Sequence, residues 1–327
     1  MPQYTPREPF RPLSVAAGPH AQTILASLIR RPNVGRLRRE RWDTPDGDFV
    51  DLDFVQGPSD APWLIVLHGL EGSARSGYVV ELLRGAKERG WNAAALNFRS
   101  CSGEPNRKIH SYSSGDTVDA KFVIRKLRER APKSKLFAAG FSLGGNVLLK
   151  TLAELGVTRD VDAAAAIGVP FDLDSCAVQI DSAGRMTWLY RSVFVSALKR
   201  KALIKAKRFP GQLDVRAIKT AKGIRAFDDV VTAKLYGYRD AGEYYRAAAS
   251  NAVLPQIRVP TLLIYAKDDP IAPPPEFSRE AMENPALHFL QSEQGGHVGF
   301  VDGTPWKPGY WAEREALHFF DQRLEQR

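Results

Sequence analysis

The sequence predicts an α/β fold in which a mostly parallel central sheet is covered by helices on both faces and carries an inserted helical cap. Short, continuous apolar runs alternate with amphipathic helical stretches, and linkers of only a few residues separate them. Such alternation is typical of a parallel sheet with helices on both faces. Residues 171–251 break the alternation, because they are helical in pattern, basic and aromatic, without a clear strand.

The individual elements are expected in a definite order. Residues 41–55 have the pattern of a hairpin, since the turn sequence PDGD separates two strand-like stretches. The run WLIVL over 63–67 has the character of a buried parallel strand. Further strands are expected over 92–98, 135–139, 163–169, 261–266 and 287–290, and helices over 78–90, 116–129, 146–155 and 311–327.

The division of the chain follows from the position of the helical segment. It lies between two predicted strands of one sheet, so we expect a core formed by residues 1–170 and 252–327 and a cap formed by residues 171–251. A length of 327 residues is sufficient for a large core. The shares of 44% hydrophobic and 25% charged residues are ordinary for a globular protein.

The net charge of +9 is concentrated in two basic runs, over 30–41 and 199–208. A basic balance can serve nucleic-acid binding, contact with an anionic membrane surface, or solubility. We find no nucleic-acid-binding module with interleaved aromatic residues, so nucleic acid is not an expected partner.

The cysteine content and the N-terminal sequence bear on the compartment. The two cysteines, Cys101 and Cys176, do not form a disulfide framework. The first residues lack the basic and apolar regions of a signal peptide. We therefore expect a cytoplasmic protein, and neither a metal nor a cofactor is expected.

One serine lies between two glycines in the stretch Gly140-Phe141-Ser142-Leu143-Gly144, with apolar runs on both sides. A simple turn is one interpretation, because Gly and Ser are common turn residues. The pattern G-x-S-x-G is also typical of a nucleophilic serine on a strained turn between a strand and a helix. It occurs by chance in roughly one chain in ten of this length, so other residues must decide.

Nucleophilic acyl transfer also requires a base, a carboxylate that orients the base, and N–H donors for the oxyanion. In a parallel sheet such groups come from loops at the carboxyl ends of strands. Asp268 and Asp269 follow one predicted strand, and His297 follows the next, in a glycine-rich loop. The loop HGLEGS, which starts at His68, follows an earlier strand and can aim a backbone N–H at the serine. The order serine, aspartate, histidine predicts a catalytic triad.

The choice of acid and base rests on the neighbouring residues. Asp269 is favoured over Asp268, because Pro270 and Pro273 fix the loop directly after it. Asp268 is expected instead to cap or to face solvent. His297 is the expected base, because its glycine neighbours leave it free to reach the serine.

These motifs and others resemble the α/β-hydrolase superfamily and, within it, the YheT-like esterase family of the AB hydrolase 4 group. The resemblance covers nearly the whole chain, and GFSLGGN combined with NFRSCSGEPN is specific. Ser100 departs from the family, where glycine is usual, which affects loop stiffness and not the triad. The matching segments are PHAQTI from Pro19, HGLEGS, NFRSCSGEPN from Asn97, GFSLGGN, Phe227-Asp228-Asp229, Tyr244-Tyr245-Arg246, DDP and GGHVGF.

The resemblance implies an α/β-hydrolase fold with Ser142 as nucleophile, Asp269 as acid and His297 as base. It also implies that the backbone N–H groups of Leu70 and Leu143 bind the oxyanion. The activity implied is that of a serine carboxylic ester hydrolase on short- to medium-chain acyl esters or acylglycerols, with a small-molecule acyl ester as its partner. The alternatives are an alcohol acyltransferase or a thioesterase with the same triad, and a non-catalytic binding protein of this fold.

The substrate pocket is expected to include His68 and Gly69 from the oxyanion loop and Phe194 and Leu198 from the cap. His68 is also expected to order the loop through its ring. Residues 188–209 have the pattern of a helix whose apolar side chains form one stripe. Either this stripe roofs the acyl pocket with its lysines in water, or the basic helix makes a weak, salt-sensitive peripheral contact with a membrane.

Overall fold

The structure is a computed structural model that describes residues 3–30, 32–158 and 160–325. Its centre is an eight-stranded sheet in the order β1-β2-β4-β3-β5-β6-β7-β8. β1 and β2 pair antiparallel, as do β2 and β4, and the other neighbours in the sheet are parallel. The strands are β1 (Arg38–Asp43), β2 (Phe49–Val55), β3 (Trp63–Leu67), β4 (Asn92–Asn97), β5 (Leu136–Phe141), β6 (Ala163–Ile167), β7 (Thr261–Ala266) and β8 (Leu287–Ser292), with a separate hairpin of β9 (Val301–Thr304) and β10 (Lys307–Tyr310).

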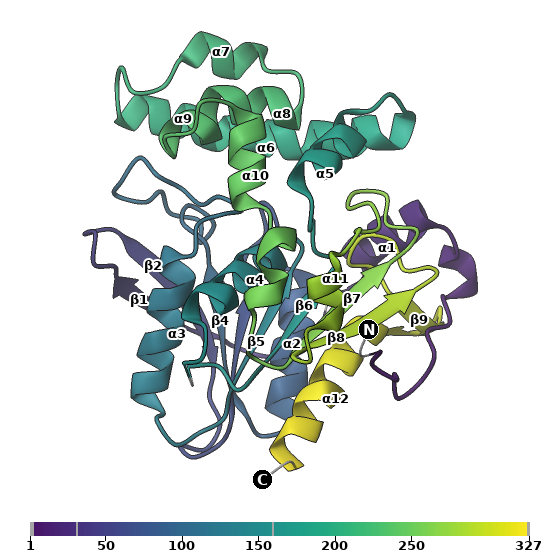
Figure 1. Cartoon of the computed structure of the whole chain (residues 1–327). Helices are drawn as coiled ribbons and strands as arrows, with labels where there is room; N and C mark the ends of the chain where they lie inside the picture. Colours follow the sequence, from purple (N-terminus) through teal and green to yellow (C-terminus); the bar gives the residue numbers. More distant parts are fainter. Residues whose placement is uncertain (1–2, 31, 159, 326–327) are drawn as a thin grey trace.

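Helices cover both faces of this sheet (Figure 1). α2 and α12 pack on one face, and α3 and α4 pack on the other, so each face is filled by its own apolar cluster. The helices outside the cap are α1 (Pro19–Ile29), α2 (Gly77–Glu88), α3 (Val118–Arg130), α4 (Leu143–Leu155), α11 (Arg279–Glu283) and α12 (Trp311–Glu325), with 3-10 turns η1 (Ser14–Ala16) and η3 (Asn251–Gln256).

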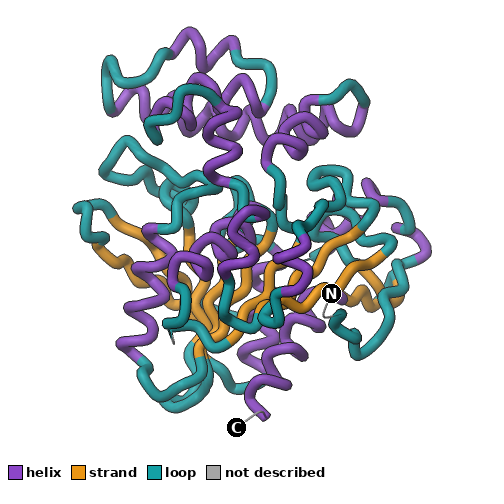
Figure 2. The backbone as a smooth tube through the Cα atoms, in the orientation of Figure 1, coloured by secondary structure: helices purple, strands orange, loops and turns teal. Residues whose placement is uncertain are grey.

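Between β6 and β7 the chain leaves the sheet and forms a separate helical layer, which contains no strand (Figures 1 and 2). We refer to residues 171–251 as the cap. Its helices enclose two further apolar clusters, distinct from those on the sheet. The elements are α5 (Leu173–Asp181), α6 (Arg185–Arg208), α7 (Val215–Thr220), α8 (Ile224–Phe227), the π-helical turn η2 (Asp228–Thr232), α9 (Ala233–Leu235) and α10 (Ala241–Ala248).

The register of the parallel strands places their carboxyl ends at one edge of the sheet. Leu67 pairs with Gly140 near the ends of β3 and β5, and Phe141 pairs with Ile167 at the ends of β5 and β6. β7 and β8 likewise end together. The loops after β3, β5, β7 and β8 therefore emerge on the same side, where the cap lies over them.

The predicted fold class is confirmed, with differences at individual elements. α4 begins at Leu143, three residues earlier than expected, because the glycines that follow Ser142 are inside the helix. Glycine usually disfavours a helix, but here Gly144 packs directly on the carbonyl oxygen of His68, where no Cβ would fit. α1, α11 and the β9–β10 hairpin were not predicted, and the last two positions of the expected closing helix, 326–327, lie outside the described residues.

Candidate active site

Ser142 occupies a sharp turn between β5 and α4. Its backbone angles, φ 50° and ψ −123°, are rare for a residue with a side chain. The turn depends on the flanking glycines, since a Cβ added at Gly140 would lie 2.5 Å from the carbonyl oxygen of Gly144. The N–H of Ser142 donates to the carbonyl oxygen of Ile167 at 2.8 Å, which fixes the turn to β6. Such a turn presents the serine hydroxyl at the edge of the sheet.

The loop after β8 brings His297 to this serine. Nε2 of His297 lies 2.8 Å from Oγ of Ser142, and Nδ1 lies 2.8 Å from Oδ2 of Asp269. The side chains of His297 and Asp269 are only 10% and 3% exposed, so water has little access to the histidine–carboxylate contact. With its proton on Nδ1, the ring donates to the carboxylate and leaves Nε2 free to accept the serine proton.

The two adjacent aspartates after β7 have different contacts. Oδ1 of Asp269 accepts two backbone N–H groups of its own loop, both at 2.8 Å, so Oδ2 remains for His297. Asp268 accepts the N–H of Gly296 at 2.9 Å, and burial raises its pKa above the ordinary value. The expectation that Asp268 caps or faces solvent is therefore wrong, because this half-buried carboxylate holds the loop that carries His297.

Two backbone N–H groups are available beside the serine. Leu143 is the first residue of α4, so its N–H has no acceptor within the helix. In the turn after β3, the N–H groups of Gly69 and Glu71 donate to tyrosine hydroxyls, whereas no described residue accepts that of Leu70. A Cβ added at Gly69 would lie 3.2 Å from Cβ of Ser142, so this turn passes directly beside the serine.

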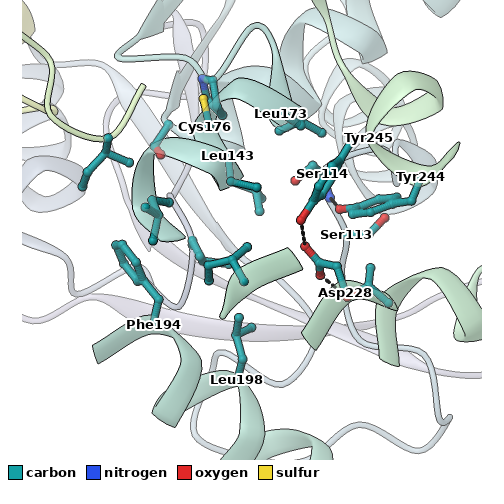
Figure 3. A pocket seen from close by; sticks show the side chains of 18 of the residues that line it. Ser113, Ser114, Leu143, Leu173, Cys176, Phe194, Leu198, Asp228, Tyr244 and Tyr245 are labelled. Carbon is teal, nitrogen blue, oxygen red and sulfur yellow. Dashed lines mark hydrogen bonds between the residues drawn. The ribbon is translucent and has the colours of Figure 1, made fainter. Parts of the chain in front are cut away.

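A cavity extends from Ser142 and His297 into the space between the sheet edge and the cap (Figure 3). Most of its wall is apolar and includes Leu143 beside the serine, Leu173 from α5, and other aliphatic side chains. Besides Ser142 and His297, the polar side chains of the wall include Tyr112, Ser113, Ser114, Asp228, Thr232, Tyr244 and Tyr245.

Sequence comparison relates the chain to a known family. Residues 62–304 match the family described as alpha/beta hydrolase fold. The chain belongs to the α/β hydrolase family. This hydrolase is 38% identical to YheT of Escherichia coli (strain K12) over 97% of its own length and 94% of that protein, so it is a YheT-like member of the family.

Two further comparisons are informative about this hydrolase. It is 30% identical to a monoacylglycerol lipase of Saccharomyces cerevisiae over 82% of its own length and 61% of that protein. The Pyrococcus furiosus esterase Pf2001 superposes with a TM-score of 0.58 at 16% identity over 89% of this chain and 92% of that one, which supports the fold alone. The protein is a hydrolase of the esterase and lipase type. Within the described residues, no helix is long and apolar enough to cross a membrane.

The expectation that His68 and Gly69 belong to the substrate pocket is wrong, because neither residue lines the cavity. His68 is fully buried, and both of its ring nitrogens are used by the backbone. Nδ1 lies 2.7 Å from the carbonyl oxygen of Gly69, and Nε2 accepts the N–H of Phe98 at 3.1 Å. Burial lowers the pKa of His68 to about 4, so the ring is neutral and orders the loop that precedes Leu70.

The cap helix α6 of the hydrolase differs in part from its predicted arrangement. Phe194 and Leu198 line the cavity, but the apolar side chains do not form one stripe, since Val193 is exposed on another side. The lysines are not all in water. Lys201 pairs with Glu71 of the loop after β3 at 2.9 Å. Lys205 is buried and donates to two backbone carbonyl groups, and burial lowers its pKa to about 8.

Helix α1, which the sequence analysis did not predict, supports the His297 loop of the hydrolase. Oγ1 of Thr23 accepts the N–H of His297 at 2.9 Å, 274 residues further along the chain. The side-chain amide of Gln22 exchanges hydrogen bonds of 2.7 and 3.0 Å with the backbone of Val301. The loop is strained, because Val298 has a φ of 57°, which is unusual for a β-branched residue. The segment PHAQTI was recognised only as part of the family resemblance.

Proposed function

We propose that the hydrolase cleaves carboxylic esters with Ser142 as nucleophile, His297 as general base and Asp269 as the acid that orients the base. The observation that carries this proposal is the unbroken chain of hydrogen bonds from Asp269 through His297 to Ser142, with 2.8 Å at each link. The distance between His297 and Ser142 allows direct proton transfer, and the distance between Asp269 and His297 allows the carboxylate to orient the ring. The chain of hydrogen bonds ends at a mainly apolar cavity, which suits an acyl group.

In the proposed mechanism, Nε2 of His297 removes the Ser142 proton as Oγ attacks the ester carbonyl carbon. Asp269 stabilises the imidazolium that forms. The N–H groups of Leu70 and Leu143 bind the oxyanion, an effect worth about 3–4 kcal/mol per donor in comparable sites. The imidazolium then protonates the leaving alcohol, and a water molecule activated by His297 hydrolyses the acyl-enzyme.

The proposed substrates are short- to medium-chain acyl esters or acylglycerols. The apolar wall of the cavity and the lipase among the relatives support this choice. In this proposal the core, residues 1–170 and 252–327, supplies the chemistry. The cap, residues 171–251, supplies the part of the wall that contacts the acyl group.

The test is the hydrolysis of p-nitrophenyl esters with acyl chains of two to sixteen carbons. Ser142→Ala should lower kcat/KM by about 10⁴-fold or more for every ester, because no other group can form the acyl-enzyme. Ser196→Ala, which removes an exposed hydroxyl on α6, is the control and should retain the wild-type rate. A Ser142→Ala protein that keeps more than a few per cent of the activity would contradict the proposal.

A further inference from the structure

The cavity has a carboxylate in its wall that the proposed mechanism does not use. Asp228 is 9% exposed and lies on the polar side of the cavity, beside Tyr244 and Tyr245 and across from Phe194 of α6 (Figure 3). Tyr245 donates its hydroxyl to Oδ2 at 2.8 Å, and Thr232 donates its hydroxyl to Oδ1 at 2.6 Å. Among the described residues, no basic side chain forms an ion pair with Asp228.

This arrangement is costly if its only role is structural. A buried carboxylate without a cationic partner is unfavourable, and a neutral amide could keep both contacts by accepting a hydrogen bond from one hydroxyl group and donating one to the other. An ionised carboxylate has about four acceptor positions, of which two are used here. Asp228 is also the first residue of the π-helical turn η2, and such turns are frequent at functional sites. The remaining acceptor capacity of Asp228 is at the surface of the cavity.

The surroundings favour a neutral donor over a cation. Both partners of Asp228 are hydroxyl groups. The guanidinium group of Arg225 already lies over the ring of Tyr245, 5.5 Å from its centre, so a positive charge is present on that side. A second cation next to Tyr245 would be repelled by this guanidinium group, whereas a hydroxyl would not.

We propose that Asp228 accepts a hydrogen bond from a free hydroxyl group of the substrate, so that the cavity selects esters of polyols such as glycerol over esters of simple alcohols. Asp228 is thus a specificity-determining residue, and this role rests on the proposed esterase function. A site built to bind a hydroxyl discriminates strongly against analogues that lack it, since its buried acceptor is then left without a donor.

The experiment compares kcat/KM for a monoacylglycerol and for the methyl ester of the same fatty acid. The wild type should prefer the monoacylglycerol, and Asp228→Asn should lower that preference by about tenfold or more, because a charged acceptor is lost. Asp229→Asn is the matched control. Its carboxylate lies next in sequence and accepts the N–H of Ala241 outside the cavity wall, so the preference should not change.

Several outcomes would overturn this role. They are a wild type that hydrolyses both esters equally well, an Asp228→Asn variant that loses both activities in the same proportion, and a stronger preference for a choline ester than for the glycerol ester. The first of these needs no variant, so a poorly folded Asp228→Asn protein does not block the test. Failure of the proposed function is distinguishable, because a folded wild type would then hydrolyse neither ester.

A second, independent observation concerns the outer surface of α6. Beside the inward side chains that line the cavity, the helix exposes Trp188, Leu189, Val193 and Ile204, which are 58%, 40%, 58% and 42% exposed. Leu189 and Val193 are four residues apart and share one side of the helix. Large exposed apolar groups of this kind commonly mark an interaction surface.

The charges of α6 indicate what this surface binds. The helix contains eight basic residues and no acidic residue. Arg185, Arg200 and Lys207 are exposed, and none of them has an ion-pair partner among the described residues. Basic side chains interleaved with exposed apolar ones are typical of a helix that lies on an anionic lipid surface.

The geometry points to docking of this α6 surface on an anionic bilayer, with the cavity behind it. The wild type should co-sediment with vesicles that contain phosphatidylglycerol at low salt, and less at high salt or with phosphatidylcholine alone. Val193→Ser with Arg200→Glu should abolish this binding. Val157→Ser, at an even more exposed apolar position after α4, is the control and should bind like the wild type.

Two results would overturn the docking proposal. One is a folded wild type that does not bind anionic vesicles at low salt. The other is a stable dimer that dissociates upon Val193→Ser, because a second copy of the chain would then cover the surface. Light scattering after size exclusion distinguishes the dimer from the monomer.

Discussion

The loops around Ser142 and the cap contribute to one cavity but are held in place differently. At the serine, position is fixed by the backbone: two N–H groups hold Asp269, Thr23 holds the loop of His297, and the absence of a Cβ at Gly140 permits the turn. In the cap, Phe194 lies in the wall through packing within a small apolar cluster.

This difference has a consequence for how the two regions tolerate change. Hydrogen-bonded, closely packed groups must stay within a fraction of an ångström of their positions for catalysis. Apolar packing is non-directional and adapts to substitutions of similar size. We therefore expect substitutions near Ser142 to change the rate for all esters, and substitutions in the cap to change which ester is preferred.

Among the residues that hold the base, the largest effect is expected at the acid. Asp269→Asn should lower kcat/KM about 10⁴-fold, because an amide no longer stabilises the imidazolium and can stabilise the wrong tautomer of His297. Asp268→Asn should be much milder, since Asp268 accepts the backbone N–H of Gly296 and does not contact the ring of His297 among the hydrogen bonds of the described residues. The measurement is p-nitrophenyl butyrate hydrolysis. An inactive Asp268→Asn with an active Asp269→Asn would reverse the assignment of the acid.

A smaller effect is expected at the support of the base. Thr23→Val removes the acceptor for the N–H of His297 and should lower kcat about tenfold with little change in KM. Thr23→Ser keeps the hydroxyl and should restore the rate. Thr23 is a positioning residue. A Thr23→Val variant that is less stable, but whose kcat does not fall while KM stays constant, would count against the prediction.

The cap should respond with altered selectivity. Phe194→Ala combined with Leu198→Ala enlarges the cavity, so the preferred acyl chain should become longer, while kcat on the best ester stays within a few-fold of the wild type. The chain-length profile over p-nitrophenyl esters of two to sixteen carbons measures this shift. An unchanged chain-length profile in a folded variant would show that these two side chains do not determine the preferred acyl chain.

The smallest effect is one of stability, and its sign differs between the two regions. The pKa of His68 in the core falls from 6.5 to about 4, so its contribution to stability is lost as the pH falls through this range. The pKa of Asp228 in the cap rises from 3.8 to about 6, so its contribution is lost as the pH rises through that range.

Guanidinium denaturation between pH 4.5 and 7 measures these contributions. His68→Gln should make the free energy of unfolding rise less steeply with pH than in the wild type. Asp228→Asn should make it rise more steeply. A common direction of change for the two variants would contradict the assigned pKa shifts.

Much of the core could be predicted from local patterns. Continuous apolar runs indicated the buried parallel strands, and the chemistry-bearing residues follow the ends of these strands. The order of Ser142, Asp269 and His297 along the chain then indicated a site at one sheet edge. The prolines after Asp269 favoured it over Asp268, in agreement with the contacts in the structure.

The remaining features depend on contacts between segments far apart in the chain. Nothing local to Thr23 shows that its hydroxyl meets a loop 274 residues later. The periodicity of α6 gives apolar positions, but not which of them other elements cover, so Val193 and Lys205 were placed wrongly. The full burial of His68 follows from packing against Phe98 of the neighbouring strand end, which the HGLEGS loop alone does not reveal.

The central claim is that Ser142 is a nucleophile activated by His297, and its most direct test is labelling with a fluorophosphonate probe followed by peptide mapping. The wild type should carry one label, on the peptide that contains Ser142, and His297→Ala should react at least about 100-fold more slowly, because its serine has lost the base that removes its proton. A folded wild type that stays unlabelled, or that is labelled at another residue, would contradict the account.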